Sequence, residues 1–340
     1  MARLSRRRQK MRNCEITRTL DETLAVASPS LVRKTLHAVD LLRKAERIAL
    51  SYDKEDGYYL AFSGGKDSQA LYHVAKLAGV RFKAHMNLTS VDPPEVIRFV
   101  RREYPDVDMI RPKASIYDMA IKKCMLPKRT ARWCCKEYKE TAGAGKVTLT
   151  GIRREESARR ARRNEVEINS RKFSGDLAGL DEYRRKKLAE EQGMSVLSVS
   201  GEHTLGCISG KESLLISPIL EWTLDEVWEF LGLTGASHCE LYDIAGWTRI
   251  GCVCCPLASD RHKRMESARY PHVKRNWKRA IIQLYDKGYL SKNPWPGNTK
   301  DEIAENIYDW WMGRWSFKEW YARRIQQGKM MFDDDKDNAV

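Results

Sequence analysis

A short glycine-rich segment has the residues needed to bind a phosphate group, and it reads Ser63-Gly64-Gly65-Lys66-Asp67-Ser68. Glycines let the backbone approach an anion closely, and successive N–H groups at a helix start form an anion-binding nest. The two serines can donate hydroxyls, the lysine adds a positive charge, and the aspartate can hold magnesium or cap the helix. The segment is not a Walker loop, which needs four residues between its first glycine and the Gly-Lys pair. We predict a phosphate loop with Lys66 and Asp67 exposed, the alternative being an ordinary Gly-Gly turn with a Ser/Asp cap.

Cysteines are the second group that could do chemistry, and the nine are Cys14, Cys124, Cys134, Cys135, Cys207, Cys239, Cys252, Cys254 and Cys255. An odd number with uneven spacing favours a metal site or catalysis over a disulfide framework in a cytosolic chain. Cys252 and Cys255 form a C-x-x-C pair, whose sulfurs lie about one turn apart, as a tetrahedral metal or a cluster requires. Other thiolates would have to complete such a site, and reduced structural cysteines are the alternative.

An arginine-rich run over residues 153–163 is the third candidate. The planar guanidinium group of arginine binds oxyanions through two parallel hydrogen bonds, so this run is suited to phosphate. A solvated loop, or one that faces RNA, is the alternative.

These residues need a framework, and the chain alternates apolar runs with helical patterns. Strands are predicted over residues 58–62, 81–86, 107–110, 146–150 and 216–219, and helices over 31–50, 67–77, 93–102, 116–123 and 181–192. A capping box from Thr223 to Glu226 predicts another helix, and residues 256–340 are helical in pattern. Repeated β-α units of this length predict an α/β fold with a doubly wound parallel sheet and helical extensions at both ends.

Composition agrees with a soluble globular protein, because 42% of the 340 residues are hydrophobic and 31% are charged. No apolar stretch approaches the roughly 18 residues of a membrane helix, and the first residues lack the apolar region of a secretory signal. We therefore expect a cytoplasmic protein with no membrane partner. The formal charge of +15 attracts polyanions, so nucleic acid is a candidate partner, although many ATP-using enzymes are also basic.

Four segments together resemble the phosphoadenosine phosphosulfate (PAPS) reductase family of the adenine nucleotide alpha-hydrolase superfamily, the PP-loop ATP pyrophosphatases. The phosphate loop is similar to the superfamily's SGGxDS loop, and residues 87–95 are similar to the family's segment after the second strand. Residues 151–157 resemble its G-x-R-x-x-E-S motif, and residues 217–223 its P-I-x-x-W-T element. The resemblance covers about residues 57–258. This division leaves a basic arm and a helix over 1–56 and a helical region over 259–340.

The resemblance implies that ATP, with Mg²⁺, lies over the carboxyl ends of the strands. The implied nucleotide contacts are Ser63, Gly64, Gly65, Lys66, Asp67, Ser68, Thr89, Gly151, Arg153 and Arg160, of which Lys66, Asp67 and Arg153 are the implied catalytic residues.

The cysteine pattern resembles the CC…CxxC arrangement of the family's iron–sulfur members, the adenylylsulfate reductases and the DNA-phosphorothioation relatives. The implied ligands are Cys134, Cys135, Cys252 and Cys255, holding a 4Fe–4S cluster, with zinc as the alternative metal. Cys124 and Cys254 are spare candidates, so the identity of the four ligands stays open.

Three functions remain as hypotheses. The first is an ATP pyrophosphatase that adenylates an oxygen of a nucleic acid or small molecule, which sulfur from a donor protein then displaces. The second is a PAPS or adenylylsulfate reductase. Such reductases use a cysteine in a flexible C-terminal tail and typically lack the loop lysine, whereas this chain has no cysteine after Cys255 and keeps Lys66. The third is a nucleic-acid-binding module with a structural metal, because residues 261–285 and 310–324 interleave basic and aromatic side chains. A helical packing face is the alternative for these two segments.

Overall fold

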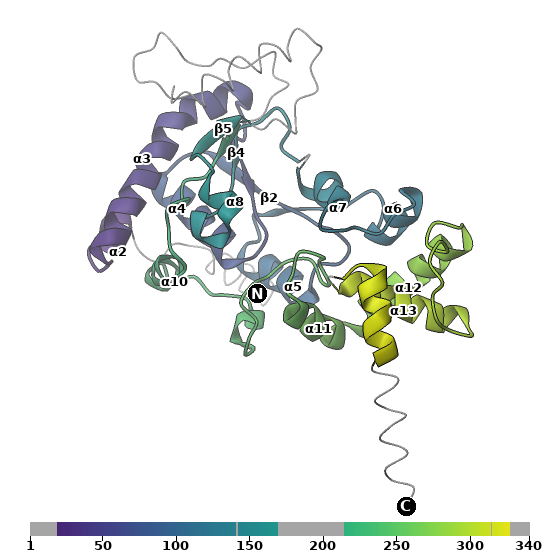
Figure 1. Ribbon diagram of the computed structural model, residues 1–340. Coiled ribbons are helices and arrows are strands. Elements are labelled where there is room, and N and C mark those ends of the chain that lie inside the picture. The colour runs from purple at the N-terminus through teal and green to yellow at the C-terminus, as the bar shows by residue number, and fades with distance from the viewer. Residues whose placement is uncertain (1–18, 141, 169–213, 314, 327–340) are drawn as a thin grey trace, which may run out of the picture. The chain divides into compact units, whose positions relative to one another are not determined.

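The computed structural model describes residues 19–140, 142–168, 214–313 and 315–326 (Figure 1). The chain divides into two compact units, which are described one at a time. The first comprises residues 1–88, 92–111 and 135–251, and the second comprises 89–91, 112–134 and 252–340.

A six-stranded sheet forms the centre of the first unit, in the order β3-β2-β1-β4-β6-β5. The strands are β1 (Tyr58–Ala61), β2 (Phe82–Asn87), β3 (Asp108–Ile110), β4 (Thr148–Leu149), β5 (Val166–Ile168) and β6 (Leu214–Ile216). All neighbouring strands pair in parallel except β5, which pairs antiparallel with β6. The predicted doubly wound parallel sheet is therefore confirmed, with one antiparallel edge strand.

The direction in which strands are added reverses at β1. The chain places β2 and β3 on one side of β1 and then returns to place β4 and β6 on the other, with Leu60 of β1 opposite Leu149 of β4. In an open α/β sheet, such a reversal creates a crevice outside the carboxyl ends of the two strands. The segments that follow β1 and β4 are thus brought to one place.

Helices surround this sheet, and those of the first unit are α2 (Leu20–Leu24), α3 (Pro29–Tyr52), α4 (Lys66–Ala78), α5 (Pro94–Glu103), the π-helix η1 (Lys136–Glu140), the 3-10 helices η2 (Arg154–Glu156) and η4 (Glu240–Asp243), α8 (Ala158–Ala161) and α10 (Leu224–Leu233). Helices α3, α4, α5 and α10 begin close to where the sequence predicts them, whereas the shorter helices were not predicted. The hydroxyl of Ser28 accepts the Leu31 N–H at the start of α3. Thr223 and Glu226 form the predicted capping box of α10.

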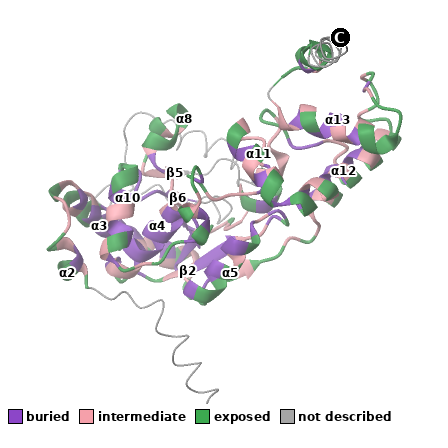
Figure 2. Cartoon of the chain, turned by 90° about the horizontal axis from the view of Figure 1, so that it is seen from below, coloured by how far each residue is buried: buried purple, intermediate pink, exposed green. Residues whose placement is uncertain are grey.

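Helix α4 is largely buried between its neighbours, and it contacts both α3 and α10. Figure 2 shows the buried residues gathered in the strands and in this helix. Helix α3 is amphipathic and buries Leu31, Val39 and Leu42. The helical spacing of its apolar residues also includes Leu36, but that side chain is 46% exposed.

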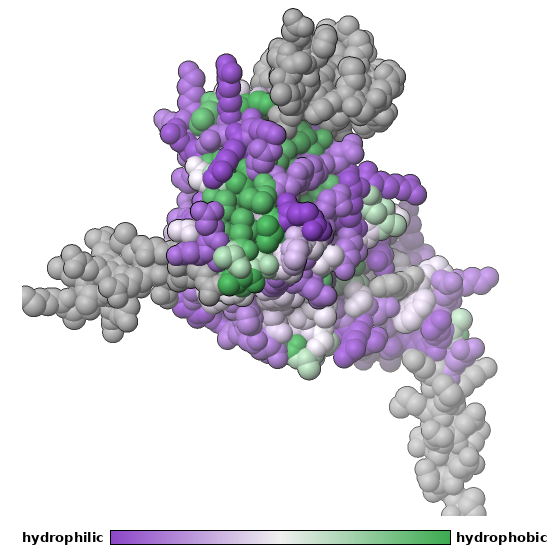
Figure 3. Space-filling model, turned by 90° about the vertical axis from the view of Figure 1, so that its left-hand side faces the viewer, coloured by the Kyte–Doolittle hydropathy of each residue, from purple (hydrophilic) through white to green (hydrophobic). Residues whose placement is uncertain are grey.

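An apolar area is visible on the side of the first unit that carries α2, α3 and α10 (Figure 3). Val26, Leu36 and Leu224, which lie on or next to these helices, are among the exposed large apolar residues. No helix in the described parts of the chain combines the length and the apolar character that crossing a membrane requires.

The second unit is helical, as predicted for the C-terminal region. It contains α6 (Ile116–Lys122), α11 (Asp260–Arg269), α12 (Pro271–Asp286) and α13 (Lys300–Met312), and the three-residue helix α7 (Trp133–Cys135) ends at its boundary. The ring of Trp277 on α12 packs against those of Tyr117 and Trp311, with centroids 4.9 and 4.8 Å away. Because Trp277 and Trp311 are buried, these aromatic residues form a packing face.

Some predicted elements differ from the structure. The strand predicted over residues 216–219 ends at Ile216, because the Leu220 N–H donates to the Ser217 carbonyl in a turn and Pro218 has no N–H to offer a sheet. Strand β4 is shorter than predicted, and β5 was not predicted at all. The helix predicted over 181–192 lies outside the described residues.

A buried chain of hydrogen bonds joins the core to the segment after β1. His73 Nε2 lies 3.1 Å from the Tyr104 hydroxyl, which donates to Gln69 Oε1 at 2.9 Å, and Gln69 Nε2 donates to the Gly64 carbonyl at 3.2 Å. Burial lowers the pKa of His73 to about 4, with the charge of Lys76 acting in the same direction. His73 is therefore neutral in the folded protein at physiological pH.

This burial predicts a loss of stability in acid. Between pH 6.5 and 4 the unfolded chain binds a proton at His73 that the folded chain does not, so the free energy of unfolding falls as the pH drops through this range. We expect His73 to contribute on the order of 3 kcal/mol to this fall. Urea denaturation of wild type and His73→Gln from pH 7.5 to 4.5 measures it, with the exposed His37→Gln as control. If the free energy of unfolding falls equally with pH in wild type and His73→Gln, the assignment of a neutral, buried His73 is contradicted.

Candidate nucleotide site

The segment between β1 and α4 is shaped by glycine. Gly64 has φ +73°, and a Cβ atom there would lie 2.8 Å from both Val96 Cγ1 and Val100 Cγ2 of α5. A side chain is therefore excluded by backbone conformation and by space. Gly65 is the N-cap of α4 and supplies no side-chain cap, so the first N–H groups of the helix depend on other partners.

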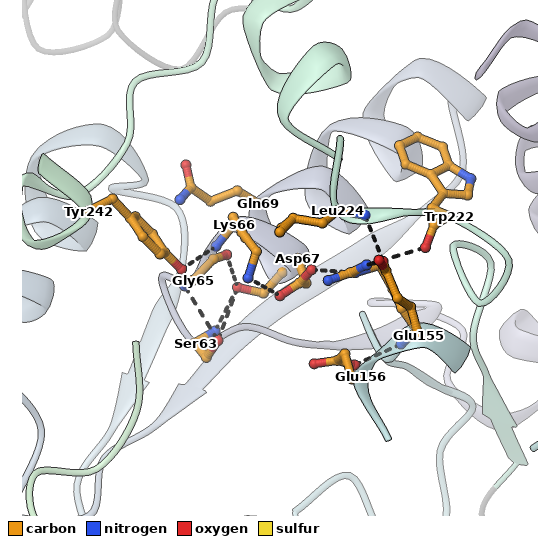
Figure 4. Close-up of polar contacts among 12 residues, drawn as sticks. Ser63, Gly65, Lys66, Asp67, Gln69, Glu155, Glu156, Trp222, Leu224 and Tyr242 are labelled. Atoms are coloured by element: carbon orange, nitrogen blue, oxygen red, sulfur yellow. Dashed lines mark hydrogen bonds and ion pairs between the residues drawn. The ribbon is translucent and has the colours of Figure 1, made fainter. Parts of the chain in front are cut away.

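Three backbone N–H groups of this segment donate to hydroxyl oxygens (Figure 4). The Ser63 N–H donates to Ser68 Oγ at 3.2 Å, and the Gly65 N–H donates to Ser63 Oγ at 3.4 Å. The Lys66 N–H donates to the hydroxyl of Tyr242 on η4 at 3.1 Å. Neutral oxygens thus lie where a phosphate loop would bind anionic ones.

Charged side chains form a continuous chain beside these donors. Lys66 Nζ lies 3.2 Å from Asp67 Oδ2, and Asp67 Oδ1 accepts from Arg153 Nε at 2.7 Å. Arg153 Nη1 donates to Glu155 Oε2 at 2.6 Å and to the Trp222 carbonyl at 3.3 Å. The prediction that Lys66 is exposed is wrong, because the residue is only 7% exposed.

Arg153 is the most buried charge of the group, at 4% exposure. Burial lowers the pKa of this guanidinium, but the negative charge of Asp67 and the hydrogen bonds that Arg153 donates to Asp67 and Glu155 outweigh burial and raise it. A permanently charged group paired in this way fixes the Asp67 carboxylate in place. Arg153 therefore acts on the loop through Asp67.

Gly151 lies two residues after the end of β4 and touches the start of α4. A Cβ atom there would lie 2.7 Å from the Asp67 carbonyl oxygen and 3.2 Å from the Ser68 nitrogen. The glycine thus permits the close approach of two segments that are far apart in sequence. The structure brings Gly151, Arg153 and the phosphate loop together, as the resemblance implies.

Two other predicted nucleotide contacts occupy different surroundings. Arg160 on α8 forms an ion pair with Glu156, which also accepts the Arg153 N–H at 2.8 Å. Thr89 belongs to the second unit, where its Oγ1 lies 3.4 Å from Cys252 Sγ.

The cysteines near the C-x-x-C pair differ from one another. Cys252 and Cys255 are half-buried, whereas Cys254 is buried in the left-handed backbone region at φ +57°. The Cys254 N–H donates to Glu266 Oε2 at 2.7 Å, and its sulfur accepts from the Tyr308 hydroxyl at 3.4 Å. Burial raises the pKa of Cys254 to about 12, so this thiol stays protonated and supports the turn.

A cluster or a zinc ion would need three or four of these side chains in one group. Across the described ranges, no three His, Cys, Asp or Glu side chains lie together in a way that could hold a metal. Cys134 falls in the second unit and Cys135 in the first. Because the four predicted ligands are divided between the two units, we derive no chemical step from an iron–sulfur cluster or a zinc ion.

Sequence reasoning missed three residues of this site. Gln69 lies one turn into α4 on its buried face and holds the Gly64 carbonyl, and helical spacing from the loop could have indicated it. Glu155 holds both Arg153 and the Leu224 N–H. Tyr242 is 176 residues from Lys66 in sequence, and no local pattern connects them.

Replacing Gly151 should disrupt the junction between the two segments. We expect Gly151→Ala to lower the free energy of unfolding by about 1–3 kcal/mol, because the new methyl group must displace the Asp67 backbone. Gly232→Ala on α10 is the matched control, since a Cβ atom there meets nothing within 4 Å. Chemical denaturation measures the free energy of unfolding of both variants. Equal values would contradict the close contact between Gly151 and the Asp67 backbone.

Comparison with known proteins places this site in a family. Residues 57–258 match the phosphoadenosine phosphosulfate reductase domain family. An uncharacterized protein of Methanocaldococcus jannaschii, MJ0973, is 23% identical over 282 residues, which cover 75% of this chain and 57% of that protein. The chain therefore spans little more than half the length of this curated relative.

Solved structures show a distant likeness of fold. PAPS reductase from Candida auris, in a phosphate complex, is 15% identical with a TM-score of 0.35, over 63% of this chain and 93% of that one. U34-tRNA thiolase NcsA from Methanococcus maripaludis, with its 4Fe–4S cluster, is 13% identical with a TM-score of 0.34, over 78% and 80%. The family match itself spans more than half of the 340 residues, so the chain belongs to the PAPS reductase family.

Proposed function

We propose that this protein binds ATP at residues 63–68 and transfers its adenylyl group to an oxygen of an acceptor, releasing pyrophosphate, in preparation for sulfur insertion. The observation that carries the proposal is the position of the loop. The loop follows β1, where the order of strands reverses, and such sheets bind ligands at this point. There Asp67 of the loop pairs with both Lys66 and Arg153.

The chemistry assigned to each group follows from its charge. The acceptor oxygen attacks the α-phosphorus of ATP, a P–O bond forms, and the bond to the departing pyrophosphate breaks. Lys66 and the loop N–H groups stabilise negative charge that develops on the phosphates. Asp67, held by Arg153, would hold Mg²⁺, which would neutralise charge on the pyrophosphate.

The adenylated oxygen is then a good leaving group. A sulfur nucleophile from a donor displaces it, so that AMP leaves with the oxygen and a carbon–sulfur bond replaces the carbon–oxygen bond. The formal charge of +15 supports a polyanionic acceptor, and we propose nucleic acid as that acceptor. We place the reaction in the cytoplasm, where ATP is available.

The second candidate is sulfonucleotide reduction, the activity that gives the family its name. That reaction needs a reachable thiolate, because thiolate is the attacking species. Cys239 and Cys254 are both buried, and burial raises the pKa of each thiol, so neither is a suitable nucleophile. The half-buried cysteines that we propose as cluster ligands are Cys134, Cys135, Cys252 and Cys255. A ligating thiolate is a poor free nucleophile, so we favour adenylation.

Loss of the loop lysine should abolish ATP use. We expect Lys66→Ala to release no pyrophosphate above background when ATP and candidate acceptors are supplied, because it removes the charge next to the phosphates. Lys76→Ala on the same helix is the matched control, since that ammonium points to Asp106. Thermal melting of both variants is needed, because Lys66 is buried.

Two outcomes would count against the assignment. Wild-type pyrophosphate release by a folded Lys66→Ala variant would show that this loop does not bind the phosphates. Robust sulfite formation from PAPS or adenylylsulfate with thioredoxin, under anaerobic conditions and beside a known reductase, would favour the second candidate.

A 4Fe–4S cluster at Cys134, Cys135, Cys252 and Cys255 stays a prediction. Anaerobic purification should yield a brown protein with about four irons per chain. Cys252→Ala and Cys255→Ala should each lose the metal, whereas Cys254→Ala should keep it, since that thiol is buried against Tyr308. A protein that contains zinc and has no visible absorbance would have a zinc site in place of the cluster. Retention of the metal in Cys252→Ala and Cys255→Ala would contradict the C-x-x-C assignment.

A further inference from the structure

Tyr242 differs from the other groups that bind the phosphate loop. Two of the loop N–H groups donate to hydroxyls of Ser63 and Ser68, which belong to the loop itself. The Lys66 N–H, the first of helix α4, instead donates to a hydroxyl from η4, far along the chain. A Cβ atom on Gly65 would lie 3.5 Å from that hydroxyl oxygen, so Tyr242 lies against the loop backbone (Figure 4).

The ring of Tyr242 is held by packing. It meets the ring of Trp228 on α10 edge to face, with centroids 5.1 Å apart, and its centroid lies 5.9 Å from Lys66 Nζ. Burial raises the pKa of Tyr242, so the phenol is neutral when it accepts the Lys66 N–H. Cys239 and Leu241, which precede Tyr242 in the sequence, are fully buried and anchor the segment.

We propose that the Tyr242 hydroxyl occupies the place of a phosphate oxygen on the Lys66 N–H, and that the nucleotide must displace it to bind. The inference rests on the proposed function, because it takes residues 63–68 as the phosphate site. Tyr242 is then a residue that sets nucleotide affinity from outside the loop.

Competition for one hydrogen is the physical basis. A backbone N–H has a single hydrogen, so a phosphate oxygen and the phenol cannot both accept it in good geometry. An anionic acceptor makes a hydrogen bond about twice as strong as a neutral one, so phosphate can replace the hydroxyl. Because Cys239 and Leu241 are anchored, rotation of the Tyr242 side chain is the simplest way for the hydroxyl to leave.

Tyr242→Phe isolates this contact. It keeps the ring that packs on Trp228 and near Lys66 while removing the competing oxygen. We expect ATP and inorganic pyrophosphate to bind about three- to tenfold more tightly, since the ligand no longer has to break a hydrogen bond. A residue with only a structural role would not raise affinity when truncated.

Isothermal titration calorimetry with ATP, and separately with inorganic pyrophosphate, measures the effect on the full chain. Tyr321→Phe is the matched control, because that phenol is exposed in the second unit. Thermal melting confirms that each variant is folded. Unchanged or weaker binding by folded Tyr242→Phe would overturn the proposal, and weaker binding would mean that the phenol itself contacts the nucleotide.

The outcomes separate this inference from the proposed function. If wild type binds ATP and releases pyrophosphate but Tyr242→Phe has wild-type affinity, the displacement is wrong and the adenylation stands. If Tyr242→Phe binds more tightly but no acceptor yields pyrophosphate, the displacement stands and the adenylation falls. If neither wild type nor folded Tyr242→Phe binds either ligand, both are wrong.

Discussion

The guanidinium group of Arg153 joins the parts of the candidate site. It pairs with Asp67 in the phosphate loop, with Glu155 in its own segment, and with the Trp222 carbonyl in the segment before α10. Glu155 also accepts the Leu224 N–H, so α10 is fixed to the same charge. A buried cation needs such partners, since leaving it unpaired would cost several kcal/mol. The three segments can therefore be positioned only together.

A second buried charge organises the C-x-x-C turn. Glu266 on α11 accepts the Cys254 N–H and lies 3.1 Å from His262 Nε2, and both residues are almost fully buried. The left-handed conformation of Cys254 is unusual for a residue with a side chain, and the carboxylate holds it there. This arrangement turns the middle thiol inward toward Tyr308 and leaves Cys252 and Cys255 half-buried.

Local pattern was sufficient for most of the fold and for the loop. Strand β1, the glycines and helix α4 follow one another in sequence, so propensity and spacing locate the phosphate loop to within a residue. Strand β5 could not be found, because among the described strands it pairs with β6 alone and a three-residue antiparallel pair depends on tertiary contact. The burial of Lys66 and the approach of Tyr242 likewise follow from packing between distant segments. The grouping of cysteines was inferred from spacing, which does not define distances in space.

The hydrogen-bonded chain from His73 through Tyr104 and Gln69 ends on the carbonyl of Gly64. Because the Tyr104 hydroxyl donates to Gln69, His73 Nε2 is the donor to Tyr104, and protonation would place the second hydrogen on Nδ1, a buried atom with no hydrogen-bond partner among the described residues. Gly64, which shapes the loop, is thus connected by hydrogen bonds to His73 in the core. Removing His73 to make the protein tolerant of acid would also change the hydrogen bonds that hold the Gly64 carbonyl. Acid tolerance and the position of the loop therefore cannot be optimised separately.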